Sequence, residues 1–274
     1  MFRRLTSISS AFVIALSAAA VNAHEFWIDP VRFSYEPGER IIAATRVGQE
    51  FAGMSGAFLP QQFRRFDIVM NGKATPVEGR LGDRPALSQT VDGTGLAVIV
   101  HETTNYIITY ETLEKFRNFL EHKDAMSILG MHTEKGYPTE NFKERYSRYA
   151  KSLVSVGGGA GRDTRVGLET EFVALTNPYT DDLSGGMAVQ LYYDGKTRPD
   201  SQVEVFEKAP DDTVNIFTVR TNRDGVASVP VKAGHRYMLD HVVLRPASGA
   251  DPDQNTALWE SLWANMTFGV PAGN

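Results

Sequence analysis

The stretch 214-VNIFTVRTNRDGVASVPVKAGHRYMLDHVVLRP-246 indicates the fold class more clearly than any other part of the chain. Its apolar runs are short, rich in Val, Ile, Phe and Thr, and interrupted by turn residues such as Asp224-Gly225. β-Branched and aromatic residues suit a pleated, half-buried strand, and Asp-Gly is a preferred hairpin turn. The stretch therefore predicts short strands joined by tight turns, with a hairpin at Asp224-Gly225.

The same pattern continues on both sides of this stretch. Before residue 111, "RIIAATRVG", "RFDIVMNGK", "GLAVIVHE" and "NYIITYE" are separated by turn pairs at Pro37-Gly38, Asn71-Gly72 and Asp92-Gly93. After residue 164, "GLETEFVALTNPY" and "GGMAVQLYYDGK" precede or contain further turn signals, including Asp194-Gly195. We predict a mainly β protein with two β-sandwich modules, at residues 24–110 and 165–272, of which the second is immunoglobulin-like.

Residues 111–155 have a helical rather than a strand period, and we predict a helical insert there. The segments "TLEKFRNFLEHKDAMSILGMH" and "TENFKERYSRYAKSLV" place apolar residues three or four apart, with a turn at 136-GYP-138 between them. In the second predicted helix, Arg145, Arg148 and Lys151 would form a cationic stripe, which could receive an anionic partner or lie solvated on the sandwich. The run 157-GGGAGRD-163 predicts a flexible linker.

The first 23 residues have the three-part pattern of a cleavable export signal. Arg3 and Arg4 precede an uncharged, mostly apolar run, and 21-VNA-23 offers small residues at the two positions that signal peptidase reads. The apolar stretch 11–20 is shorter than the roughly 20 residues needed to span a bilayer, so no stable membrane insertion is expected. We predict cleavage after Ala23 and a periplasmic protein that begins at His24.

Composition excludes several classes of function. Loss of residues 1–23 would remove two arginines and no acidic residue, which changes the net charge from −5 to −7. Nucleic acid is therefore not an expected partner, because phosphate binding needs a basic surface. The chain has no cysteine, which excludes thiolate ligands and nucleophiles, and an exported protein without disulfides points to a bacterial envelope.

Signals for catalysis are equally absent from the sequence. No GxSxG motif occurs, "GGGAG" lacks the Lys-Ser/Thr of a phosphate-binding loop, and no pair of carboxylates has a recognisable catalytic spacing. We therefore predict a binding protein rather than an enzyme.

Histidines are the candidate metal ligands. After cleavage, His24 would offer its α-amine and its imidazole together, a chelating arm that suits Cu(II), Ni(II) or Zn(II), and His101 and His241 are the candidates to complete the site. The alternative is that His24 simply begins a strand and that the other two are hydrogen-bonded residues at the edge of the core. His235 would lie roughly 20 Å from His241 on a continuous strand, so these two cannot share an ion.

Six segments together resemble a known family: "HEFWIDP", "GDRPA", "ERYSRYAKSLVSVG", "LETEFVALTNPY", "TNRDGVASVPV" and "WESLWANMTF". They are similar, in order and over the whole mature chain, to a bacterial periplasmic family with a domain of unknown function. That family is often described as the periplasmic component of cobalt or nickel ABC uptake systems. The resemblance implies capture of nickel or cobalt and an inner-membrane ABC importer as partner.

Two alternatives remain open. Copper is one, because an amine-imidazole arm suits Cu(II) and this ion is at the top of the Irving–Williams order. A metal-independent envelope module that docks a partner protein is the other, since sandwich folds are frequent interaction scaffolds although fold alone does not assign function.

Overall fold

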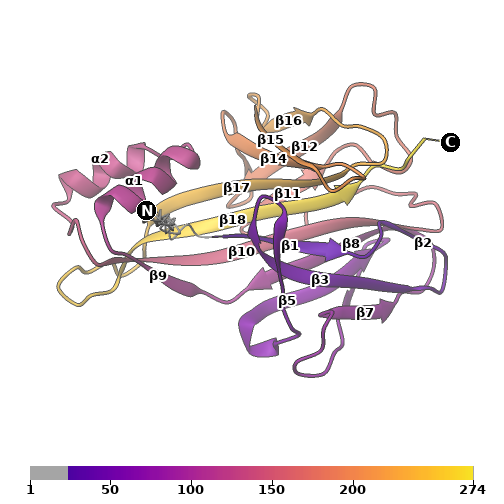
Figure 1. Ribbon diagram of the computed structural model, residues 1–274, viewed down its shortest axis with the longest axis horizontal. Coiled ribbons are helices and arrows are strands. Elements are labelled where there is room, and N and C mark those ends of the chain that lie inside the picture. Colours follow the sequence, from indigo (N-terminus) through magenta and orange to yellow (C-terminus); the bar gives the residue numbers. More distant parts are fainter. Residues whose placement is uncertain (1–23, 274) are drawn as a thin grey trace, which may run out of the picture.

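The computed structural model describes residues 24–273, and these are mainly β, as predicted (Figure 1). The predicted signal peptide, residues 1–23, lies outside the described residues. A ten-stranded sheet, here the central sheet, runs through the whole molecule. Its main path has the strand order β15 (Val214–Arg220), β14 (Gln202–Lys208), β17 (Arg236–Pro246), β18 (Ala257–Gly269), β10 (Phe142–Val156), β8 (Gly95–Thr103), β5 (Phe63–Met70) and β6 (Lys73–Pro76). The short strands β2 (Ser34–Tyr35) and β9 (Tyr106–Tyr110) also pair with β10.

Two smaller sheets cover the opposite faces of the central sheet. The N-terminal sheet contains β1 (Glu25–Pro30), β3 (Arg40–Gln49), β4 (Ala52–Ser55) and β7 (Leu87–Thr90). The C-terminal sheet contains β11 (Thr170–Ala174), β12 (Met187–Tyr193), β13 (Lys196–Thr197) and β16 (Val226–Val229). A 3₁₀ turn, Pro60–Gln62, precedes β5.

Each small sheet encloses a separate hydrophobic core against the central sheet. Ile28 and Ile41 of the N-terminal sheet pack in one core with Val154 of β10. Phe172 of the C-terminal sheet packs in the other with Leu153, the next residue back along β10. Successive residues of a strand point to opposite faces, so β10 supplies both cores. The central sheet is therefore common to the two modules that the sequence predicted as separate.

Two helices occur in the predicted helical insert, residues 111–155, and both lie before residue 135. Thr112 caps α1 (Leu113–His122), whose buried residues include Phe116 and Phe119, and α2 (Ser127–Glu134) follows directly. The two helices cover one end of the central sheet, beside β9 and the start of β10 (Figure 1). They lie on the face opposite the C-terminal sheet, because Val242 shares their core whereas the next residue of β17, Val243, packs in the core with the C-terminal sheet.

The second predicted helix is wrong: residues 142–156 form β10, the strand between β18 and β8. The charged residues that imitate a helical period are instead distributed on the two faces of a strand. On one face, Glu144 accepts hydrogen bonds from Tyr110 and Ser261. On the other, Lys151 pairs with acidic residues of the segment 163–171. The partners of Glu144 and Lys151 lie between 12 and 117 residues away in the sequence, beyond the range that a local period can reveal.

Two predicted turns are tight hairpins and a third is not. Asn71-Gly72 joins β5 to β6 and Asp194-Gly195 joins β12 to β13, all four residues having positive φ as this turn requires. Asp224-Gly225 joins β15 of the central sheet to β16 of the C-terminal sheet, so its flanking strands belong to different sheets.

The predicted flexible linker, residues 157–163, is held in place. Asp163 is buried and pairs with Lys151 at 2.7 Å, and the side-chain amide of Asn177 donates to the carbonyls of Gly159 and Gly161.

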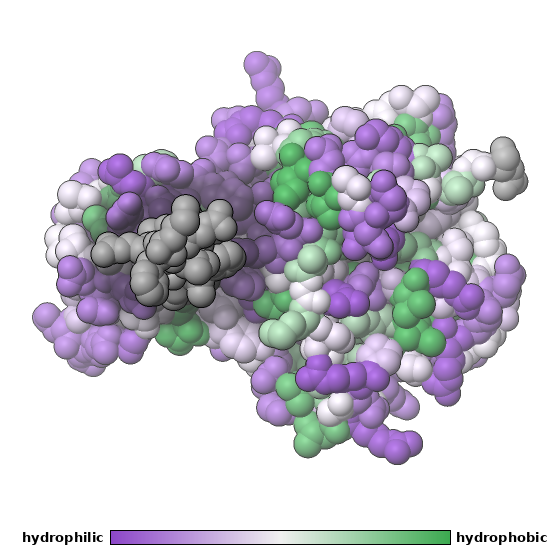
Figure 2. Space-filling view, in the orientation of Figure 1, coloured by the Kyte–Doolittle hydropathy of each residue, from purple (hydrophilic) through white to green (hydrophobic). Residues whose placement is uncertain are grey.

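Within residues 24–273, no helix has the length and apolar character needed to cross a bilayer. On the face shown in Figure 2, hydrophilic residues predominate over the helical end, and hydrophobic surface occurs in small separate patches. Isolated patches of this size are ordinary for a protein surface.

Candidate cation-binding site

His101 lies in an aromatic environment that does not suit a metal ligand. Its ring is 4.8 Å from that of Phe66 and 5.0 Å from that of Phe26, and the side chain is buried. Burial, with the nearby charge of Arg148, lowers the pKa of His101 to about 3, so the ring is neutral. Its Nδ1 accepts or donates no hydrogen bond among the described residues.

His241 already uses both ring nitrogens in protein contacts. Nε2 accepts a hydrogen bond from Nε of Arg198 at 2.9 Å, and Nδ1 donates to the carbonyl of Gln202 at 2.8 Å. Burial, and then the charge of Arg198, lowers the pKa of His241 to about 3. His241 lies two residues from Leu239 and Val243, so it faces the side of the C-terminal sheet. His101 lies two residues from Ile99, so it faces the side of the N-terminal sheet. The two histidines lie on opposite faces of the central sheet and do not share a site.

His24 is the exposed residue immediately before β1. Its carbonyl accepts a hydrogen bond of 2.9 Å from Nη2 of Arg148, which fixes the backbone at the start of this strand. The three predicted ligands are thus not brought together, and no group of three or more His, Asp or Glu side chains between residues 24 and 273 is already arranged to hold a metal ion.

Acidic side chains surround a buried lysine where α1 ends. The Nζ of Lys123 lies 2.7 Å from Oε2 of Glu204, 3.0 Å from Oδ2 of Asp240 and 3.5 Å from Oε1 of Glu25. These four residues come from the end of α1, β14, β17 and β1, and none is more than 7 % exposed. The ring of Trp263 lies 5.0 Å below the ammonium. We call Glu25, Lys123, Glu204 and Asp240 the junction cluster, because they lie where the helices meet the N-terminal sheet.

A cavity of about 380 Å³ opens onto this cluster. Its lining combines three acidic residues, one histidine, one amide and two apolar side chains: Glu25, Gln49, Glu50, His122, Glu204, Phe206 and Ile216. His122 is half exposed, and its Nε2 lies 2.8 Å from Oε1 of Glu204. Oε2 of Glu25 is buried and has no hydrogen bond from another described residue. The cavity, which we call the junction cavity, therefore presents carboxylate oxygens and an imidazole without a full set of partners.

The protonation of the junction cluster follows from burial and charge. Burial raises the pKa of Glu204, but hydrogen bonds and charges from His122 and Lys123 outweigh it and lower the value to about 2. Burial and the charge of Asp240 raise the pKa of Glu25 to about 7 against the opposing charge of Lys123. Burial lowers the pKa of Lys123, but the three carboxylates outweigh it and raise the pKa above its usual range. At neutral pH, an ionised Glu204 thus faces the cavity beside a charged Lys123.

Sequence reasoning did not find this site, although two signals were present. Lys123 continues the apolar face of α1, three residues after Leu120, which is an unusual position for a charged side chain. Glu204 interrupts the apolar strand "QVEVFEK", where its side chain faces the interior. An unpaired charge in an apolar pattern requires a partner, so both residues mark a buried ionic site.

The fold and the junction cavity define a mainly β protein with a mixed carboxylate–imidazole site between its helices and its first strand. The chain belongs to the family described as Domain of unknown function (DUF4198), whose model matches residues 21–244. This confirms the family resemblance at the level of the unknown-function domain.

Solved structures give only distant similarities. One is "Crystal structure of tetra-tandem repeat in extending region of large adhesion protein", with 12% identity, a TM-score of 0.21, and coverage of 90% of this chain and 49% of that one. Another is "Biofilm associated protein - BSP domain", with 9% identity, a TM-score of 0.20, and coverage of 90% of this chain and 30% of that one. The chain thus spans half or less of either structure. No curated protein matches.

Proposed function

We propose that the protein is a non-enzymatic, periplasmic binding protein that captures a divalent transition metal ion, nickel or cobalt, for an inner-membrane ABC importer. The observation that carries this proposal is the junction cavity, where the imidazole of His122 and the carboxylates of Glu204 and Glu25 face one space. Nickel and cobalt as the ions, and the importer as the partner, rest on the family resemblance. The proposal moves the site from His101 and His241 to these residues.

The donor set fits such an ion. Imidazole nitrogen and carboxylate oxygen are suitable ligands for nickel, cobalt, copper and zinc. Two ligands at about 2.05 Å from one ion and at right angles to each other are about 2.9 Å apart. The 2.8 Å between Nε2 of His122 and Oε1 of Glu204 is close to that separation. An ion could therefore bind between the two with little movement of either side chain.

Lys123 and Glu25 would complete the arrangement in different ways. Lys123 holds the second oxygen of Glu204 at 2.7 Å, which orients the first oxygen toward His122 and the cavity. Groups behind the ligands commonly orient them in this manner in metal sites. The free Oε2 of Glu25 supplies a third donor, and His24 immediately before it would add an amine and an imidazole if cleavage follows Ala23.

Calorimetric titration with Ni(II), Co(II), Cu(II) and Zn(II) tests the proposal. We expect binding by the native protein and a loss of at least ten-fold in affinity in both His122→Ala and Glu204→Gln. His235→Ala is the matched control, because His235 Nδ1 also lies 2.8 Å from a glutamate, Oε1 of Glu207, but outside the junction cavity. No binding of any of the four ions, or equal affinities in His122→Ala and His235→Ala, would exclude the site.

The ion and the N-terminus are tested separately. The relative affinities alone do not identify the physiological ion, because Cu(II) generally binds N and O donors most tightly. Induction of the protein by starvation for nickel, cobalt or copper would distinguish them. For the N-terminus, one glycine added before His24 should weaken binding as much as His24→Ala does, if a free α-amine is a ligand. Unchanged affinity with the added glycine would exclude the amine.

A further inference from the structure

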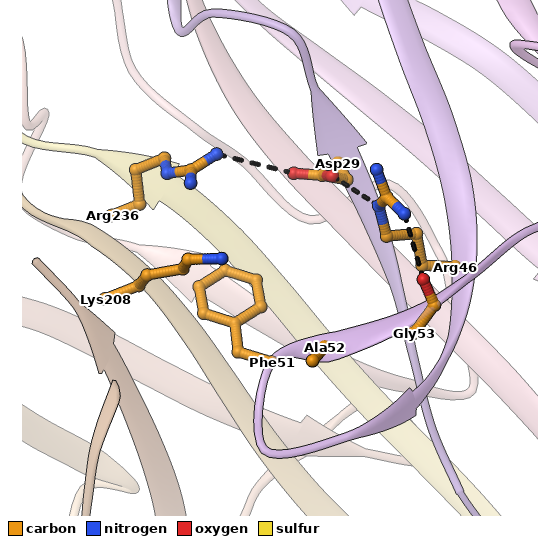
Figure 3. A pocket seen from close by; sticks show the side chains of 7 residues that line it. All are labelled: Asp29, Arg46, Phe51, Ala52, Gly53, Lys208 and Arg236. Carbon is orange, nitrogen blue, oxygen red and sulfur yellow. Dashed lines mark hydrogen bonds and ion pairs between the residues drawn. The ribbon is translucent and has the colours of Figure 1, made fainter. Parts of the chain in front are cut away.

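A second cavity lies between the N-terminal sheet and the central sheet, next to the junction cavity along β14, and is shown in Figure 3. It has a volume of about 340 Å³ and is lined mostly by charged residues: Asp29, Arg46, Phe51, Ala52, Gly53, Lys208 and Arg236. Its three cations come from three strands. Lys208 of β14 and Arg236 of β17 are direct partners in the central sheet, and Arg46 of β3 faces them from the N-terminal sheet. We call this the basic cavity.

The carboxylates near the basic cavity do not use all of its hydrogen-bond donors. Asp29 lies 2.5 Å from Nε of Arg46 but 3.9 Å from Nη1 of Arg236, which is too long for a hydrogen bond. The exposed Asp212 lies 3.0 Å from Nζ of Lys208 and 3.4 Å from Nη2 of Arg236. Within residues 24–273, Arg236 therefore has only one long hydrogen bond for its five N–H groups. Three cations and two carboxylates leave one positive charge in excess.

Arg46, by contrast, is fixed in one orientation. Its Nε donates to Asp29 and its Nη1 donates to the carbonyl of Gly53 at 2.9 Å, as the dashed lines in Figure 3 show. A guanidinium held in this way is preorganised, because little side-chain freedom remains to be lost when a ligand binds. The cavity thus has a rigid cation on one side and a pair of cations with free donors on the other.

A small apolar edge accompanies these charges. Phe51 lies in the turn between β3 and β4 with a φ of 58°, and its ring packs edge-on against Trp27 at 5.7 Å. Both belong to a small core with Phe206 and Met238, which fixes the Phe51 ring beside the cavity. Phe51, which is 6 % exposed, and Ala52 give the cavity a small apolar edge against which a short carbon chain could rest, whereas the rest of the lining is polar.

We propose that the basic cavity binds a small organic dicarboxylate. One carboxylate would contact Lys208 and Arg236, the other would lie toward Arg46, and the carbon chain between them would pack on Phe51. Guanidinium groups bind carboxylates through paired N–H donors, and a volume near 340 Å³ is at the lower end of the usual range for ligand sites, which suits a ligand of this size. This site shares no lining residue with the proposed metal site.

Calorimetric titration with succinate and glutarate tests this inference, using protein dialysed against a chelator so that the junction cavity holds no metal. We expect binding of at least one of the two, weakened at least ten-fold by Arg236→Gln and by Lys208→Gln. Arg220→Gln is the control, because Arg220 pairs with Asp124 and Asp200 outside the basic cavity. Affinity should also fall with rising salt concentration, because the contacts are ionic.

Three outcomes would overturn the inference. The first is no binding of either dicarboxylate at millimolar concentration by folded native protein. The second is binding that neither Arg236→Gln nor Lys208→Gln weakens relative to Arg220→Gln. The third is inorganic phosphate bound as tightly as the better dicarboxylate, which would mean that the cavity recognises charge without the carbon chain. Circular dichroism of each variant ensures that only folded protein is compared.

Discussion

Replacement of Lys123 by methionine should destabilise the protein strongly at neutral pH. Methionine keeps the length of the side chain and its packing on Trp263, but it removes the ammonium that lies 2.7 to 3.5 Å from three carboxylates. Removing one partner from a buried ionic group leaves charge without compensation and costs about 3–5 kcal/mol. Because domains are stable by only about 5–15 kcal/mol, this is a large fraction of the total.

The assay is urea unfolding of Lys123→Met and the native protein, followed by far-UV circular dichroism. Lys115→Met is the matched control: Lys115 is also in α1 and pairs with Glu111 at 2.6 Å, but the pair is exposed and solvent screens it. We expect a large shift of the unfolding midpoint in Lys123→Met and almost none in Lys115→Met. A change below about 1 kcal/mol in the free energy of unfolding of Lys123→Met would refute the reasoning, because buried carboxylates that lose their cation should destabilise the fold by more than this.

Three further outcomes are expected from single substitutions. Burial raises the pKa of Glu144 to about 7, so the stability that Glu144 contributes is complete below its unfolded pKa of 4.5 and is lost as pH rises through 7. In urea titrations, the stability of Glu144→Gln relative to the native protein should therefore increase by up to about 3 kcal/mol between pH 4.5 and pH 8. Lys151→Met should release the segment around Asp163, which it holds at 2.7 Å, and limited trypsin digestion should then cut faster at the exposed Arg162; equal cutting rates would contradict this. Burial lowers the pKa of His101 to about 3, so its contribution to stability is present above pH 6.5 and is lost as pH falls toward 3. The variant His101→Phe should therefore be less sensitive to acid and should bind metals as the native protein does. Greater acid sensitivity of this variant in thermal melts would contradict the prediction.

Local sequence signals predicted the elements that depend on local physics. The hairpin at Asn71-Gly72 follows from the positive φ that both residues adopt easily. The helix α1 follows from the cap at Thr112 and from the spacing of Phe116, Phe119 and Leu120 on its buried face. In each case the residues that determine the structure lie within a few positions of one another, so the sequence contains the whole cause.

The strand β10 could not be predicted in the same way. Its charges at Arg145, Arg148 and Lys151 are three residues apart, which is a helical spacing, and a solvated helix face is the simplest explanation for them. In the fold, Arg145 pairs with Glu260 at 2.7 Å and Arg148 binds the carbonyl of His24. These two partners lie more than a hundred residues away, and Lys151 pairs with Asp163 and Glu171, so each charge is compensated through a tertiary contact. Tertiary contacts thus override the local period.

The candidate site has the same origin. Glu25, Lys123, Glu204 and Asp240 are spread over most of the chain. The pairing of β14 with β17 places Glu204 beside Asp240, and β1 and the end of α1 pack against them. The sequence also does not show which face of the central sheet a histidine occupies, and His101 and His241 lie on opposite faces. His122 has no partner ligand at helical spacing, and the carboxylate that lies 2.8 Å from it, Glu204, is 82 residues further along the chain.

Comparison of the two buried lysine clusters supports a functional role for one of them. Glu171, which pairs with Lys151, also accepts hydrogen bonds from the backbone of residues 166–168, so its oxygens are satisfied within the fold. The junction cluster instead opens to a cavity, and Oε2 of Glu25 there has no partner from another described residue. A cation bound at the junction cavity would compensate acidic charge that Lys123 alone shares among three carboxylates, and its binding would be coupled to folding. At a concentration one hundred times its Kd, such an ion should add about 2.7 kcal/mol to the free energy of unfolding, and this gain should vanish in Glu204→Gln but persist in Glu171→Gln.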